Sequence, residues 1–385
     1  MLDDKGAARR APALSFLRQL IWLSALIVGL VLACSFAAPA RADPIQIKDV
    51  MGREVVLHAP ARRIVLGAGR HLSVIGLIHR DPASLVVGWR DDFSRDTSNF
   101  AAWAEKFPRV AEIPVIGGVA GDGLAVETIV GLSPDLVILS LYDAEAPSTG
   151  RSIDMLTQLG IPVLVVDFFS HPLENSLPSL KMLGRAIGAE ERADAFAAFY
   201  MAHLERVRSR LASEPLDRPS VFMHVHAGGM PCCSTPGHGV FNEMIELAGG
   251  RNVALERVPG LYGDVSLEQL IVDDPKIYIA TGGAHLAARG GLVLGPGIDR
   301  ESARQSFDRL LGSVGIAELS AVREGRAHAL WHMFNDSPTH IVMIEKLARI
   351  FHPDRFADLD PQETIDAINR DFLAVPMSGV YWLDR

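Results

Sequence analysis

One pattern occurs twice in the sequence, as LAVETIVGLSPDLVIL at residues 124–139 and as VSLEQLIVDDPKIYI at residues 265–279. In each copy a glutamate opens a short amphipathic helix, a proline follows seven positions later, and an apolar strand begins at once. The glutamates are Glu127 and Glu268. The distance between the copies is too long for a solenoid period. The repeat therefore predicts two similar α/β halves, each with its own sheet.

Short apolar runs alternate with amphipathic segments through the first half of the chain. The expected strands are residues 63–66, 84–88, 136–139 and 161–166, and the expected helices are residues 72–78 and 152–159. This alternation predicts a mostly parallel, Rossmann-like sheet with helices on both faces. With 385 residues, 49% of them hydrophobic, the chain is long enough to bury two such cores.

A segment without Gly or Pro, residues 190–213, lies between the two halves and has apolar residues at helical spacing. As a helix it would be about 35 Å long, and would act as a stiff connection. A new strand is expected at residues 220–225. We therefore predict an N-terminal α/β lobe at 43–189, a bridging helix at 190–214 and a C-terminal α/β lobe at 215–385.

The first 42 residues have the layout of an export signal. A basic segment ends at Arg18, an uncharged run reaches Cys34, and Ala40-Arg41-Ala42 supplies the small residues that a signal peptidase needs. Cleavage after Ala42 is expected, which predicts a periplasmic protein. A lipid on Cys34 and an uncleaved anchor are the alternatives.

The net charge of the chain argues against nucleic acid as a partner. Residues 1–42 carry five basic and two acidic side chains, so their removal changes the formal charge of −9 by −3, to −12. So acidic a chain is not expected to bind nucleic acid. The sequence also contains no H-E-x-x-H, G-x-S-x-G or phosphate-binding G-x-x-x-x-G-K-[ST] motif, which argues against an enzyme.

Six segments together resemble one known family. They are residues 60–66 (PARRIVL), 132–138 (LSPDLVI), 159–163 (LGIPV), 248–253 (AGGRNV), 265–268 (VSLE) and 351–356 (FHPDRF). In this order they are similar to the periplasmic substrate-binding proteins of ABC importers for cobalamin, ferric siderophores and haem. The resemblance implies two lobes bridged by one helix, a cleft that closes little on binding, and no intrinsic cofactor.

The resemblance also implies a partner, the permease dimer of an ABC importer in the inner membrane, for a protein that is itself monomeric. In the family an acidic residue on each lobe docks onto arginines of the permease, and Glu127 and Glu268 match these positions. The alternative is that each glutamate offsets the dipole of its own helix.

Ligand contacts are expected from the loops at the carboxyl ends of the parallel strands. The candidates are Arg70, His71, Arg90, Tyr142, Phe168, His226, Tyr262, His285, Arg289, Trp331 and His332. Arginine suits an anionic ferric chelate, and Tyr or Trp offers a flat apolar surface. Two alternatives remain open: His71 can cap the helix that follows it, and one of Phe168 and Phe169 belongs to the core.

A ferric siderophore is the preferred ligand, because several arginines occupy candidate positions. Haem is the second choice, with His71, Tyr142 or His226 as a possible axial ligand, and cobalamin or a small nickel or cobalt chelate follows.

Residues 224–238 depart most from the family pattern, because His226, Cys232, Cys233 and His238 form a possible metal-ligating set for Zn, Ni or Cu. The alternatives are a loop that lines the ligand site without a metal bond, a structural loop, and a disulfide between the adjacent cysteines. A metal-dependent hydrolase using His224, His226 and His238 is the remote competing function.

Overall fold

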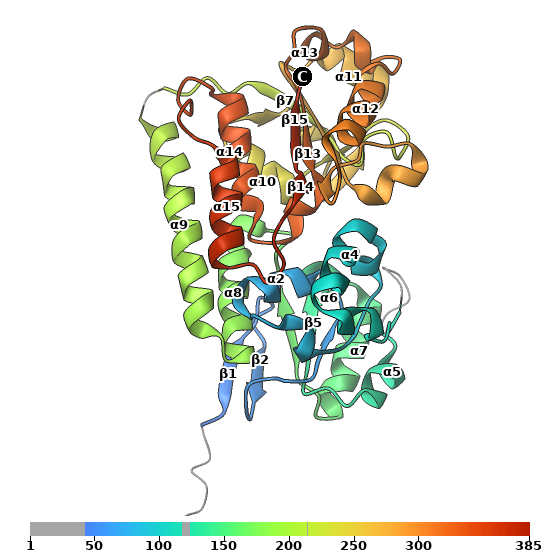
Figure 1. Cartoon of the computed structure of the whole chain (residues 1–385), viewed down its shortest axis with the longest axis vertical. Coiled ribbons are helices and arrows are strands. Elements are labelled where there is room, and N and C mark those ends of the chain that lie inside the picture. The colour runs from blue at the N-terminus through green and yellow to red at the C-terminus, as the bar shows by residue number, and fades with distance from the viewer. Residues whose placement is uncertain (1–42, 118–123, 214) are drawn as a thin grey trace, which may run out of the picture. The chain divides into compact units, whose positions relative to one another are not determined.

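The structure is a computed structural model that describes residues 43–117, 124–213 and 215–385. Residues from Ile45 to Arg385 form one compact unit, built on two main sheets (Figure 1). The predicted export signal, its cleavage site and Cys34 lie outside the described residues. Within the part of the chain that is described, no helix is both long and apolar enough to cross a bilayer.

The first lobe is the part built around a four-stranded sheet in the order β4-β3-β5-β6, all parallel. Neighbouring residues of its strands alternate between two hydrophobic clusters, so that Ile64 and Ile138 pack in one and Val65 and Val137 in the other. Because both faces are buried, the strands are continuous apolar runs. The predicted parallel sheet with two covered faces is confirmed.

The strands of this sheet are β3 (Ile64–Leu66), β4 (Val86–Trp89), β5 (Leu136–Ser140) and β6 (Val163–Val166), and an antiparallel hairpin, β1 (Ile45–Lys48) and β2 (Glu54–Leu57), precedes them. The helices of the lobe are α2 (His71–Ile78), α3 (Asp92–Arg95), α4 (Thr97–Lys106), α5 (Val126–Gly131), α6 (Leu141–Ala144), α7 (Pro147–Gln158) and α8 (Pro172–Ile187).

One strand begins later than predicted. Residues Pro82–Leu85 form a 3₁₀ turn, and β4 starts at Val86 rather than at Ser84. The Asp81 carboxylate accepts a hydrogen bond from the Ser84 amide at 3.2 Å. An Asp followed by a Pro favours such a turn, and this local signal outweighs the apolar run that follows.

The second lobe is built around a five-stranded sheet in the order β15-β13-β11-β7-β9. All neighbouring pairs are parallel except β13 with β15, so the antiparallel strand lies at an edge. Its strands are β7 (Ser220–His224), β9 (Arg251–Asn252), β11 (Ile277–Gly282), β13 (Ala327–Trp331) and β15 (Trp382–Asp384). Its helices include α10 (Val240–Leu247), α11 (Leu267–Asp273), α12 (Arg300–Leu311), α13 (Ser320–Arg323), α14 (His340–Phe351) and α15 (Pro361–Asp371).

The repeated pattern has the same structure in both lobes. Glu127 lies in the first turn of α5, which leads into β5, and Glu268 lies in the first turn of α11, which leads into β11. The predicted helix-then-strand unit is confirmed in both copies.

The predicted bridging helix is α9, Glu190–Ala212, which ends two residues before the predicted boundary at residue 214. It packs against α2 and α8 of the first lobe and against α14 of the second (Figure 1). Its His203 and Arg206 both reach the fully buried carboxylate of Glu345 on α14. These contacts make α9 an integral part of the core. The lobe boundaries at residues 189 and 215 remain a prediction.

Candidate ligand-binding cleft

The loops that follow the parallel strands of both lobes line one cleft of about 550 Å³. The first lobe contributes residues that follow β3, β4, β5 and β6, and the second lobe contributes residues that follow β7, β11 and β13. The lining residues are Arg70, Asp92, Arg95, Asp96, Tyr142, Phe169, Val225, His226, Met230, Ser234, Tyr262, His285, His332, Met333 and Asn335. This is the position predicted for a ligand in parallel α/β sheets, and the volume suits a compact small molecule.

Three imidazoles form the second lobe's wall of the cleft. The rings of His226 and His332 lie 3.8 Å apart between centroids, with an interplanar angle of 32°. His226 Nδ1 lies 3.1 Å from His285 Nε2. Each histidine follows a different strand of the sheet, so only the parallel alignment of β7, β11 and β13 brings them together.

Hydrogen bonds hold His332 in one tautomer. The Asn335 amide nitrogen donates to His332 Nε2 at 3.3 Å, so Nδ1 carries the proton, and it lies 3.0 Å from Thr281 Oγ1. The same Thr281 oxygen accepts the backbone N–H of His226 at 3.2 Å. Both nitrogens of His332 are therefore occupied, and this ring is a fixed support for His226.

His226 is the histidine best placed to offer a lone pair to a ligand. Among the described residues, no hydrogen bond occupies its Nε2. A neutral imidazole has one donor and one acceptor nitrogen. When Nδ1–H donates to His285 Nε2, the lone pair of His226 Nε2 is free for a metal, an arrangement typical of metal-ligating histidines.

Burial keeps all three rings neutral. Desolvation, with the positive charge of Arg289 and the proximity of His285 adding to it, lowers the pKa of His226 to about 4. Desolvation and Arg289 also lower the pKa of His285. The pKa of His332 lies well below its usual value because of burial, with His226, His285 and Arg70 adding to the effect. Neutral imidazoles are the form that binds metals.

Aromatic rings form a ladder along the cleft. The ring of Tyr142 packs edge-on against that of Phe169, with 5.6 Å between centroids. The Phe169 ring in turn lies 6.0 Å from the ring of Tyr262, a residue of the second lobe. The Arg70 guanidinium lies 5.9 Å from the centre of the Phe169 ring. Together they provide a flat, largely apolar surface for a chelate or macrocycle.

The arginines of the site are paired with carboxylates. Arg70 forms an ion pair with Asp336 of the second lobe and lies 3.7 Å from Asp92. Arg90 is buried and pairs with Asp143 at 3.0 Å, outside the cleft lining. The lining itself holds two arginines and two aspartates, so its formal charges balance and do not favour a strongly anionic ferric chelate.

Three of the predicted contact residues are buried and lie outside the cleft lining. His71 is fully buried, packs 5.6 Å from Phe168, and has a pKa lowered to about 3 by burial and by Arg70. Phe168 is itself 1% exposed, so of the two neighbouring phenylalanines it is Phe169 that lines the cleft. Trp331 packs against Phe334 and Tyr381 and lines a small side pocket rather than the cleft.

Arg289 is exposed and lies outside the lining residues, although its charge acts on His226 and His285. Tyr142, His226, Tyr262, His285 and His332 do line the cleft, together with Arg70, as predicted. Of the three possible axial ligands for haem, Tyr142 and His226 remain at the cleft and His71 does not.

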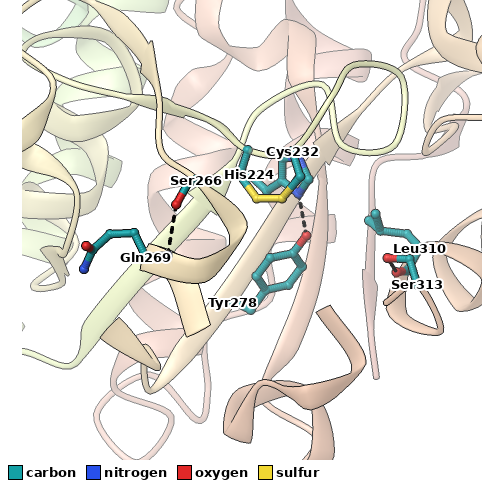
Figure 2. The surroundings of a disulfide bond; sticks show 8 residues. His224, Cys232, Ser266, Gln269, Tyr278, Leu310 and Ser313 are labelled. Atoms are coloured by element: carbon teal, nitrogen blue, oxygen red, sulfur yellow. Dashed lines mark hydrogen bonds between the residues drawn. A yellow bond between two sulfur atoms is a disulfide. The ribbon is translucent and has the colours of Figure 1, made fainter. Parts of the chain in front are cut away.

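The structure does not assemble the predicted metal-ligating set. His226 lies with the other cleft histidines, and His238 is exposed, with its backbone N–H bonded to Gly260. The two cysteines form a disulfide, and the histidine beside them is His224 (Figure 2). The hydrolase arrangement of His224, His226 and His238 is likewise absent from the groups of potential metal ligands among the described residues.

Several lining residues were not predicted. Asp92 and Asp96 follow β4, Asn335 follows β13, Met230 lies in the loop after β7, and Ser234 begins the short strand β8 (Ser234–Pro236) that follows this loop. Their position after a strand end is a signal that could have found them. Asp96 also lines a side pocket of about 100 Å³ beside the cleft. Burial raises its pKa to about 6, against the opposing effect of the Asn99 amides.

Two α/β lobes with mainly parallel sheets, one long helix that packs against both, and a cleft lined by loops of both lobes are the features of a solute-binding protein. The family described as periplasmic binding protein matches residues 94–330. The chain belongs to this family.

Relatives and solved structures agree with this assignment. A "Vitamin B12-binding protein" of Yersinia pestis (strain Pestoides F) is 29% identical over 163 residues, which are 42% of this chain and 53% of the relative. The chain thus spans about half the length of the curated relatives it matches. A TroA-like periplasmic binding protein, FepB, from Veillonella parvula has a TM-score of 0.78 at 23% identity, covering 89% of this chain and 99% of that one.

Helicobacter pylori CeuE, in a structure described as a Ni-His complex, has a TM-score of 0.61 at 19% identity, covering 87% of this chain and 97% of that one. At these identities the two solved structures support the fold.

Proposed function

We propose that this protein captures a metal chelate between its lobes in the periplasm and delivers it to an ABC importer. The observation that carries the proposal is the position of His226, whose Nε2 is open at the cleft while His285 fixes its Nδ1 at 3.1 Å. An imidazole of this kind fills a vacant coordination position of a bound metal. The protein then acts as a carrier, not as an enzyme, and needs no resident cofactor.

Within this class an iron complex with an open coordination position remains the preferred ligand. The cleft offers an imidazole from one lobe, a phenol from the other at Tyr142, and an aromatic ladder between them. Phenol and imidazole are both ligands of ferric iron in haem sites. A ferric siderophore with incomplete coordination and haem both meet these conditions. A nickel or cobalt chelate is supported by the same imidazole.

Cobalamin is the second candidate, and the names of the sequence relatives favour it. Its cobalt also has an axial position that an imidazole can fill. In this case the sequence relatives add to the support that the imidazole of His226 gives.

The proposal is tested by native mass spectrometry of the protein beginning at Asp43, offered ferric siderophores, haemin, cobalamin and nickel-histidine together. One retained metal chelate, whose visible spectrum changes on binding, supports the proposal. The same spectrum with His226→Ala must lack that change, while His58→Ala, an exposed histidine outside the cleft, must keep it. Retention of none of the four classes would contradict the proposal.

A further inference from the structure

A second group of metal-philic atoms lies apart from the open nitrogen of His226. His224 ends strand β7, and Cys232 and Cys233 come from the loop that follows it. One ring nitrogen of His224 and the two sulfur atoms all lie within 4.8 Å of one another. Figure 2 shows the disulfide beside the His224 ring.

The His224 ring is oriented as a ligand would be. Its Nδ1 lies 2.7 Å from the hydroxyl of Tyr278 on β11 (Figure 2). Its Nε2 is buried and has no hydrogen-bond partner among the residues that the structure describes, and the whole residue is only 2% exposed. A buried imidazole nitrogen without a partner is costly. When Nδ1–H donates to Tyr278, the lone pair of Nε2 is free.

We propose that His224, Cys232 and Cys233 form a redox-gated site for a thiophilic divalent ion such as Zn²⁺. In the disulfide form the sulfurs are not thiolates and hold no ion. In the reduced form two thiolates and one imidazole hold one ion, with a fourth position open to solvent or a small ligand. Two sulfurs and a nitrogen suit zinc-like ions and not calcium or magnesium.

The spacing is compatible with this geometry. Zinc bonds of about 2.3 Å to sulfur and about 2.0 Å to nitrogen place tetrahedral ligands roughly 3.5–4 Å apart. The ring nitrogen and the two sulfurs already lie within 4.8 Å of one another. Reduction breaks the bond between the sulfurs and frees them to separate to the spacing of zinc ligands.

A dithiol can reduce the disulfide between Cys232 and Cys233 by thiol–disulfide exchange. A dithiol thiolate attacks the sulfur of Cys232, which is exposed whereas Cys233 is fully buried, and the disulfide bond breaks to release Cys233. The second thiol of the reductant then displaces Cys232 and closes its own disulfide. Two electrons and two protons pass to the protein. Binding of the ion then releases the two thiol protons.

The test uses the full chain carrying Cys34→Ser, which leaves Cys232 and Cys233 as the only cysteines. Zn²⁺ is counted by native mass spectrometry before and after reduction with a phosphine, which is converted to its oxide and then removed. Reduction is expected to add one equivalent of Zn²⁺. The same count in both states would overturn the proposal, because the cleft histidines do not respond to reduction.

Variants separate this site from the rest of the segment. Cys232→Ser and His224→Asn are each expected to weaken binding of the Zn²⁺ that is taken up after reduction at least about 100-fold. Tyr278→Phe, which removes the support of Nδ1, should weaken it about 10- to 100-fold. His238→Ala, exposed in the same segment, should leave it unchanged. Full retention by Cys232→Ser or by His224→Asn would overturn the proposal.

One measurement needs no variant at the site. In the reduced parent protein Zn²⁺ should protect both cysteines from alkylation by iodoacetamide, and a chelator should restore the reaction. Alkylation at the same rate with and without Zn²⁺ would refute the site, whether or not the variants fold.

Discussion

Nδ1 of His226 lies 3.1 Å from Nε2 of His285, and these two rings come from loops after different strands of one parallel sheet. The contact determines which nitrogen of His226 is available in the cleft. In the proposed complex His285 is a positioning residue, and His226 is the residue proposed to contact the metal of the chelate.

This relationship predicts different effects for two substitutions. His226→Ala should weaken binding of the chelate retained in the mass-spectrometric screen about 10- to 100-fold and abolish its spectral change. His285→Gln, which retains a hydrogen-bonding group, should weaken binding less and preserve the spectral change. Calorimetry and visible spectra of both variants, with His58→Ala as control, check this. Equal loss of the spectral change in both variants would assign direct contact to His285 as well.

The buried His71 predicts that stability depends on pH. Its pKa is about 3 in the folded protein against 6.5 in the unfolded chain. The unfolded chain therefore binds the extra proton below about pH 6.5, and stability falls as the pH is lowered. The loss between pH 7 and pH 5 from this group is about 2 kcal/mol.

His71→Leu should accordingly lose about 2 kcal/mol less than the parent protein over this interval, measured by urea unfolding at both pH values. His58→Leu, at an exposed position, should not change the slope. The prediction is wrong if His71→Leu and the parent protein have the same pH dependence.

Asp96 is expected to change stability with pH in the opposite direction to His71. Its pKa of about 6 in the folded protein exceeds its ordinary 3.8, so the folded state binds the extra proton and stability decreases as the pH rises from about 4 to 6. Asp96→Asn should therefore increase the free energy of unfolding at pH 7.5 by about 1 to 3 kcal/mol. Asp154→Asn, on the exposed face of α7, is the control and should have little effect. An Asp96→Asn variant that is less stable than the parent protein at pH 7.5 would contradict this prediction.

Docking to an importer predicts a separation of binding from transport. Glu127 and Glu268 are exposed in the first turns of equivalent helices, so Glu127→Lys or Glu268→Lys should abolish chelate uptake by cells and leave chelate affinity unchanged. Glu301→Lys, which reverses an exposed first-turn glutamate on α12, is the matched control for the helix dipole. Loss of chelate affinity in either docking variant, or equal loss of uptake with Glu301→Lys, would contradict docking.

The sequence alone was enough to predict elements that depend on local periodicity. The repeated glutamate-to-proline pattern predicted α5 and α11, and the run without Gly or Pro predicted α9 within one residue. It also placed candidate ligand residues correctly after the strand ends, because parallel strands all present their carboxyl ends to the same side of a sheet. The start of β4 was missed because the turn formed by Asp81 competes with the apolar run.

Only the tertiary structure decided which of these residues share a site. Position after a strand does not show whether a side chain turns into the core, as His71 and Phe168 do, or into the cleft, as Phe169 does. The direction depends on packing between segments far apart in the chain, which sequence spacing does not contain. For the same reason the sequence grouped His226 with nearby cysteines, whereas strand alignment grouped it with His285 and His332 and left His224 beside the disulfide.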